Sequence, residues 1–167
     1  MIKPVLIFGY GNLSRGDDAL GPLLLEHIEN NFASDAIEIL TDFQLQIEHA
    51  LDLEDRELVL FVDASVSNQS AFNFSKLQAA KDKSYTTHAM SPTALLHVYQ
   101  NIKKQSPPPC FLLSIQGVSF ELGEDLSKKA EVNLQLAIQF TQQLLNTPEL
   151  NYWDQKKSSI SNNEKSI

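Results

Sequence analysis

The stretch GYGNLSRGDDALGP, residues 9–22, follows the short apolar run VLIF and leads into a helix-like segment. It contains four glycines and the adjacent acids Asp17 and Asp18. A glycine-rich turn between a buried strand and a helix is typical of α/β proteins, which bind ligands beyond the carboxyl ends of parallel strands. The stretch therefore predicts an initial strand–loop–helix unit with both acids at the edge of the sheet where sites form.

Outward from this stretch, apolar runs and amphipathic segments alternate along the chain. Strands are predicted at 4–8, 36–40, 57–63, 71–77 and from Cys110, and helices at 19–32, 43–53, from Pro92 and over 125–146. The helix over 43–53 is expected to bury Phe43, Ile47, Ala50 and Leu51. Alternation of this kind predicts an α/β fold, a three-layer α/β/α sandwich with a twisted, mostly parallel central sheet.

The domain is expected to span residues 1–147, because the chain turns polar from Pro148. Residues 148–167 are predicted to be a disordered C-terminal tail. The 167 residues suit a single domain with a core of its own.

Composition excludes several classes of protein. The net charge of -8 argues against nucleic-acid or anionic-membrane partners and is compatible with a cation or a basic peptide. The single cysteine, Cys110, excludes an internal disulfide and a CxxC motif, and it is expected to be a small core residue. No apolar run has the length of a signal peptide or a membrane span, so a cytoplasmic protein is expected.

The glycines of residues 9–22 fit a dinucleotide-binding fingerprint only in part. Gly9 and Gly11 match, but Ser14 stands where the third glycine is needed and Gly16 comes two residues late. Two carboxylates at this place would also repel a pyrophosphate. A nucleotide-binding α/β enzyme remains the lesser alternative.

Three residues form a candidate metal-ligand set. Asp18 follows the first strand, Asp63 ends the apolar strand LVLFVD, and His88 precedes the helix that begins near Pro92. Two carboxylates and an imidazole suit a first-row divalent metal rather than a structural zinc. Each residue also has an ordinary structural alternative: a helix cap for Asp18, with Asp17 as the other candidate cap, a turn for Asp63, and a backbone-bonded loop histidine for His88.

These segments together resemble the [NiFe]-hydrogenase maturation endopeptidases. The resemblance rests on GYGNLSRGDDALGP, LVLFVDAS and THAMSP, and it covers about residues 1–145. Two further stretches, FQLQIEHALDL and PPPCFLLSIQGVSFELGEDLS, are similar to the branch that serves the bidirectional, NAD-linked hydrogenase.

The resemblance implies a peptidase, grouped with the aspartic type, that removes the C-terminal extension of a hydrogenase large-subunit precursor after nickel insertion. It implies that Asp18, Asp63 and His88 are the catalytic and metal-binding residues, and that the metal is the nickel already held by the precursor. No tightly bound cofactor of the protease is then expected, and the protein is expected to be a monomer. A nickel-dependent chaperone or precursor-binding protein without proteolysis is the alternative.

The chain departs from the family pattern after the second strand. Many members have a glycine-rich turn there, where this chain reads TDFQLQ. Asp42 is the candidate for the turn's aspartate, and Gln44 and Glu48 are candidates for substrate contact, with a solvated helix face as the simpler account.

Overall fold

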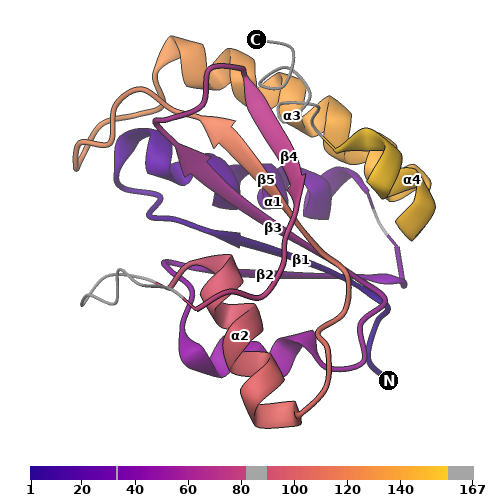
Figure 1. The fold of residues 1–167 in the computed structure, drawn as a ribbon. Coiled ribbons are helices and arrows are strands. Elements are labelled where there is room, and N and C mark those ends of the chain that lie inside the picture. The colour runs from indigo at the N-terminus through magenta and orange to yellow at the C-terminus, as the bar shows by residue number, and fades with distance from the viewer. Residues whose placement is uncertain (33, 82–89, 158–167) are drawn as a thin grey trace, which may run out of the picture.

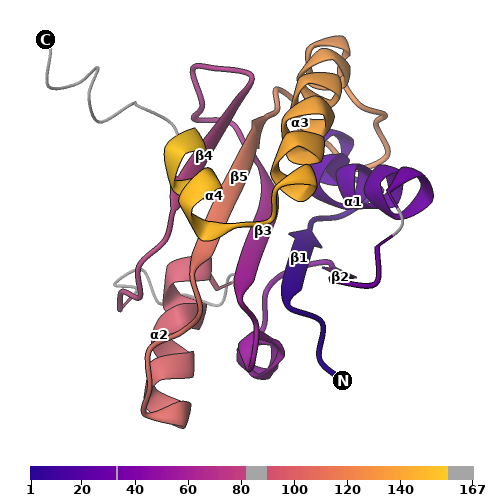
Figure 2. The same cartoon turned by 90° about the vertical axis from the view of Figure 1, so that its right-hand side faces the viewer.

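The structure, a computed structural model, describes residues 1–32, 34–81 and 90–157. Five strands form one sheet in the order β2-β1-β3-β5-β4, parallel except for the antiparallel edge strand β4. Figures 1 and 2 show the twisted sheet with helices on both of its faces. The strands are β1 (Val5–Tyr10), β2 (Ile37–Asp42), β3 (Leu58–Ser65), β4 (Phe72–Lys76) and β5 (Cys110–Gln116). The helices are α1 (Leu20–Asn31), α2 (Pro92–Lys103), α3 (Lys128–Asn146) and α4 (Leu150–Lys156), with 3-10 turns η1 (Gly16–Ala19) and η2 (Ile47–Leu53).

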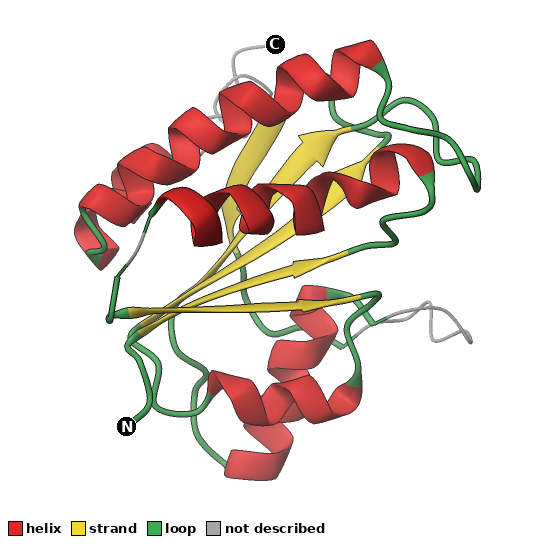
Figure 3. Ribbon diagram, turned by 180° about the vertical axis from the view of Figure 1, so that it is seen from behind, coloured by secondary structure: helices red, strands yellow, loops and turns green. Residues whose placement is uncertain are grey.

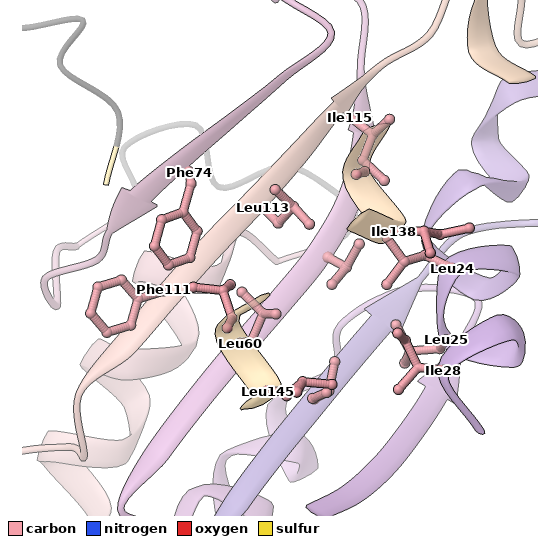
Figure 4. Close-up of a cluster of buried hydrophobic side chains, with 14 of the residues drawn as sticks. Leu24, Leu25, Ile28, Leu60, Phe74, Phe111, Leu113, Ile115, Ile138 and Leu145 are labelled. Carbon is pink, nitrogen blue, oxygen red and sulfur yellow. The ribbon is translucent and has the colours of Figure 1, made fainter. Parts of the chain in front are cut away.

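The sheet separates two hydrophobic cores. One core lies between the sheet and α1, α3 and α4, and Figure 4 shows its side chains, among them Leu24, Leu60 and Ile138. The second core, which includes Phe8, Phe61 and Leu95, lies on the opposite face under α2 and η2. Figure 3 shows helices on both sides of the strands. The predicted three-layer α/β architecture is confirmed.

Local signals in the sequence place most helices correctly. The stripe Leu20, Leu24 and Ile28 of α1 is fully buried, as the helical period predicts. Ser91 caps α2, its hydroxyl oxygen accepting the Ala94 N–H at 3.2 Å, and Pro92 follows at the first helical position.

The prediction for residues 43–53 is wrong in the extent and type of helix, and in burial for three of the four residues expected in the core. Only Ile47–Leu53 are helical, in a 3-10 turn, and Phe43, Ile47 and Leu51 are 72%, 54% and 55% exposed. A 3-10 helix repeats every three residues, so an i, i+4 stripe does not stay on one face. Ala50 is buried as expected, and Leu53 faces the core beside it.

The prediction of a disordered tail from Pro148 is wrong as far as Lys157. Residues 150–156 form α4, and Trp153 is fully buried in the core shared with α3. Its Nε1–H donates to the Leu144 carbonyl at 2.9 Å, and its ring packs edge-on against Phe74 and Phe111. Burial of this one large indole stabilises the docked helix, although the residues around it in the sequence are mostly polar. Residues 158–167 lie outside the described residues.

Within the described residues, every helix is too short or too polar to cross a lipid bilayer.

Candidate functional site

The loop after β1 brings Asp18 to the carboxyl edge of the sheet. Gly11 has φ of 150°, and a Cβ there would lie 2.0 Å from the Asp18 carbonyl oxygen, so only glycine fits. The Asp18 carboxylate turns back on the same loop, where its Oδ2 accepts the Asn12 N–H at 2.7 Å. Its side chain remains partly exposed.

Asp17 has a structural role, and it does not cap α1. Neither η1 nor α1 has a side-chain cap. The fully buried Asp17 carboxylate instead accepts the backbone N–H groups of Val118, Ser119 and Ser127 and the Ser127 hydroxyl, at 2.7 to 3.1 Å. Burial raises its pKa, but these donors outweigh burial and the pKa is lowered below its ordinary value. Asp17 therefore fastens the first loop to the segment that leads into α3.

Asp63 lies in the central strand with a hydroxyl donor on each side. The Tyr10 phenol donates to its Oδ2 at 3.0 Å, and the Ser114 hydroxyl donates to its Oδ1 at 3.1 Å. Burial raises the Asp63 pKa to about 6, the two hydrogen bonds lower it, and the nearby charge of Asp18 raises it. Burial and the charge of Asp63 also raise the pKa of Tyr10 well above its ordinary value, so this phenol stays a proton donor at neutral pH.

Two of the three residues predicted from the sequence thus come together. Asp18 and Asp63 are 45 positions apart, yet they are close enough for the charge of one to act on the pKa of the other. The third residue, His88, lies outside the described residues. Within the described residues, no three histidine, cysteine or acidic side chains are arranged to hold a metal ion. Asp18 and Asp63 supply two carboxylate donors, and such a pair attracts a cation.

An open cleft of about 270 Å³ lies beside Asp42, between the loop after β1 and the end of β2. Its lining is Gly11, Leu13, Pro22, Thr41, Asp42 and Phe43. Asp42 faces His49, whose Nε2 lies 3.2 Å from Asp42 Oδ2, and His49 Nδ1 accepts the Gln46 N–H at 2.8 Å. His49 therefore contacts both ends of the segment 42–46, Asp42 through Nε2 and Gln46 through Nδ1. Gln44 and Glu48 are exposed, and no contact with a substrate tests their predicted role.

The amides of the glycine-rich loop are already bonded within the protein. The Gly11 N–H donates a hydrogen bond to the Asp42 carbonyl, and the Gly16 N–H donates to the Glu124 carbonyl. The Asn12 N–H donates to Asp18 Oδ2. A phosphate-binding loop presents such amides to its ligand. This bonding argues against the nucleotide-binding alternative.

Tyr10 and Ser114 are site residues that the sequence did not reveal. Tyr10 is the last residue of β1, and Ser114 lies opposite Asp63 in the register of β3 and β5. The signal was the place of Tyr10 soon after one predicted strand and of Ser114 within another, but strand order and register are needed to pair them with Asp63. Cys110 is buried and burial raises the pKa of its thiol, so it is the core residue that the sequence predicts.

The chain matches no family model and no curated protein at a significant level. Solved structures do match. The hydrogenase maturating endopeptidase HybD from E. coli is 22% identical, with a TM-score of 0.67, covering 86% of this chain and 93% of that one. The [NiFe] hydrogenase maturation protease HycI from Thermococcus kodakarensis KOD1 is 20% identical, with a TM-score of 0.66, covering 87% and 94%.

The hydrogenase 2 maturation peptidase from Thaumarchaeota archaeon SCGC_AB-539-E09 is 23% identical, with a TM-score of 0.63, covering 86% and 98% of the two chains. At such identities the likeness concerns the course of the backbone. This chain has the fold seen in hydrogenase maturation proteases, and it carries a carboxylate pair at the carboxyl edge of its sheet.

Proposed function

We propose that this protein is an endopeptidase that removes the C-terminal extension of a [NiFe]-hydrogenase large-subunit precursor after nickel insertion. The observation that carries the proposal is that η1, which contains Asp18, packs beside β3, which contains Asp63, at the carboxyl edge of a fold shared with proteases of this class. The resemblance of residues 9–22 and of LVLFVDAS to the family motifs supports it independently of the backbone comparison.

In this proposal Asp18, Asp63 and His88 bind the nickel that the precursor presents. The metal is part of the substrate, and the protease holds no tightly bound cofactor of its own. Two neighbouring carboxylates repel each other, and a divalent cation between them relieves the repulsion. Cleavage then waits for nickel, because the metal anchors the scissile peptide at the edge of the sheet.

The identity of the precursor, the type of peptidase, the oligomeric state and the cellular compartment are also proposals. The FQLQIEHALDL and PPPCFLLSIQGVSFELGEDLS segments favour the precursor of the bidirectional, NAD-linked hydrogenase as the partner. The carboxylate pair favours grouping with aspartic-type peptidases, and we propose a monomer that acts in the cytoplasm.

The experiment is cleavage of nickel-loaded precursor, followed by intact mass. Asp18→Asn, Asp63→Asn and His88→Gln are each expected to slow cleavage by about 100-fold or more, since loss of even a hydrogen-bond partner of a metal ligand costs about 10- to 100-fold. The matched controls are Asp35→Asn, at the amino edge of the sheet, and His27→Gln, on α1. Wild-type rates in all three site variants would overturn the assignment.

The same experiment separates the alternative functions. A nickel-dependent chaperone or precursor-binding protein would form a complex with the precursor and leave its mass unchanged. Precursor without nickel must stay uncleaved if the metal is the recognition element. Cleavage of nickel-free precursor at the same rate would contradict nickel recognition while keeping the peptidase.

A further inference from the structure

We propose that Tyr10 and Ser114 are positioning residues, which fix the orientation of the Asp63 carboxylate from the two neighbouring strands. The geometry stands by itself, and its consequence for cleavage rests on the proposed function.

The three side chains form a row across the sheet. β3 lies between β1 and β5, and the parallel register sets Gly9 beside Val62 and Asp63 beside Ser114. Tyr10 and Asp63 each come one residue after the paired Gly9 and Val62, so the row Tyr10–Asp63–Ser114 shares one face of the pleated sheet. Each outer residue donates one hydroxyl to a different oxygen of the central carboxylate, at 3.0 and 3.1 Å.

This arrangement determines the plane of the carboxylate. The terminal torsion of aspartate has a broad, two-fold preference, so packing at Cβ alone does not set it. A donor on each oxygen, from opposite sides, holds the group against rotation. The Tyr10 ring is itself held, because it packs edge-on against Phe8 with 6.4 Å between the ring centres.

Both oxygens keep the capacity to bind a cation. A carboxylate oxygen accepts two hydrogen bonds, and each Asp63 oxygen has one donor among the described side chains. The hydroxyl donors therefore orient the group without using up its lone pairs. Ligands held in this way by hydrogen bonds bind metals more tightly than free ones.

The test compares Tyr10→Phe and Ser114→Ala with two matched controls. Ser114→Thr keeps the hydroxyl, and Tyr99→Phe removes a buried phenol on the same face that is bonded to Gln105. The measurements are kcat and KM for nickel-loaded precursor, together with the melting temperature.

Tyr10→Phe and Ser114→Ala are each expected to raise KM by about 10- to 100-fold, because the carboxylate that meets the substrate's nickel is then held at one oxygen and no longer at both. Ser114→Thr and Tyr99→Phe should keep the wild-type KM. A purely structural role would lower the melting temperature and the active fraction, hence the apparent kcat, and leave KM unchanged. That result, or an equal rise of KM in Tyr99→Phe, overturns the proposal.

A second readout is independent of cleavage. The side-chain carboxyl carbon of Asp63, observed by ¹³C NMR in the protein without precursor, should change its resonance in Tyr10→Phe and Ser114→Ala and keep it in Tyr99→Phe. If the wild-type protein cleaves no precursor, the proposed function fails and this measurement still decides the positioning. An unchanged resonance in both variants overturns it.

Discussion

Ser127 donates two hydrogen bonds to Asp17, one from its backbone N–H and one from its hydroxyl, both at 2.8 Å and across 110 positions of sequence. The same hydroxyl oxygen accepts the Ala130 N–H and caps α3. The loop after β1 and the start of the longest helix are thus joined through one buried carboxylate.

Replacement of Asp17 should destabilise the fold without removing a contact of Asp18 or Asp63. Asp17→Ala removes the carboxylate acceptor of three part-buried backbone N–H groups, so we expect a loss of about 1–3 kcal/mol in the free energy of unfolding. Asp35→Ala, an exposed acid, is the control. Urea unfolding measures both, and equal stabilities would contradict the anchoring role.

The lowered Asp17 pKa gives that stability a pH dependence. The folded-state pKa lies below the unfolded one, so the contribution is present above the ordinary aspartate pKa of 3.8 and is lost as pH falls through the folded-state value. Below pH 4 the stability of the wild type should approach that of Asp17→Ala.

Asp63→Asn should stabilise the protein without its substrate. The folded-state pKa of about 6 lies above the ordinary 3.8, so the fold favours protonated Asp63, and its stability falls as the pH rises from about 4 through about 6. A pKa rise of this size lowers the free energy of unfolding at neutral pH by roughly 3 kcal/mol at most.

Urea unfolding of Asp63→Asn and wild type at pH 5 and pH 8 measures this difference. The gain of the variant should be larger at pH 8, where wild-type Asp63 is ionised in a partly buried place. A loss of stability in the variant that is the same at both pH values would show that burial and the charge of Asp18 do not strain Asp63.

Gly21→Ala should destabilise the protein, whereas a glycine-to-alanine change in a helix usually stabilises it. Alanine normally stabilises a helix interior by about 0.5–1 kcal/mol over glycine. Here a Cβ would lie 2.8 Å from the Val62 carbonyl oxygen and 2.9 Å from that of Tyr10, so we expect a net loss of about 1–3 kcal/mol. Asn30→Ala, on the exposed face of α1, should be neutral or slightly stabilising. Thermal unfolding distinguishes the two, and a gain in Gly21→Ala would contradict the close approach of α1 to the sheet.

Trp153 is the chain's single tryptophan, so its fluorescence reports the docking of α4. Emission should be that of a buried indole and should shift to longer wavelength on unfolding. Trp153→Ala should cost about 3–5 kcal/mol, whereas Asn151→Ala, exposed on the same helix, should cost little. A solvent-exposed emission in the native protein would contradict the docked helix.

The fold was predictable where local signals and burial agree. The stripe of α1, the Ser91 cap and the apolar strands each indicate one element of the fold. The exposed side chains of Phe43 and Ile47 were mispredicted, because apolar spacing indicates a helical face and does not show whether another element covers it. Trp153 was missed for the converse reason, since one indole in a polar segment has no periodicity.

For the candidate site, Asp18 was predictable as a residue after a strand and Asp63 as a residue at the end of one, but their contacts were not. Asp17 and Asp18 are chemically identical neighbours, and only their tertiary partners, Ser127 among them, distinguish the anchor from the candidate site acid. Tyr10 and Ser114 depend on strand order, which alternation alone does not fix.

The packing of α4 also bears on how the protein is made. The aromatic cluster of Phe74, Phe111 and Trp153 joins the antiparallel strands β4 and β5 to an indole that is synthesised about eighty positions after Phe74 and about forty after Phe111. The core on this face of the sheet therefore stays incomplete during synthesis until Trp153 is available to pack against β4 and β5.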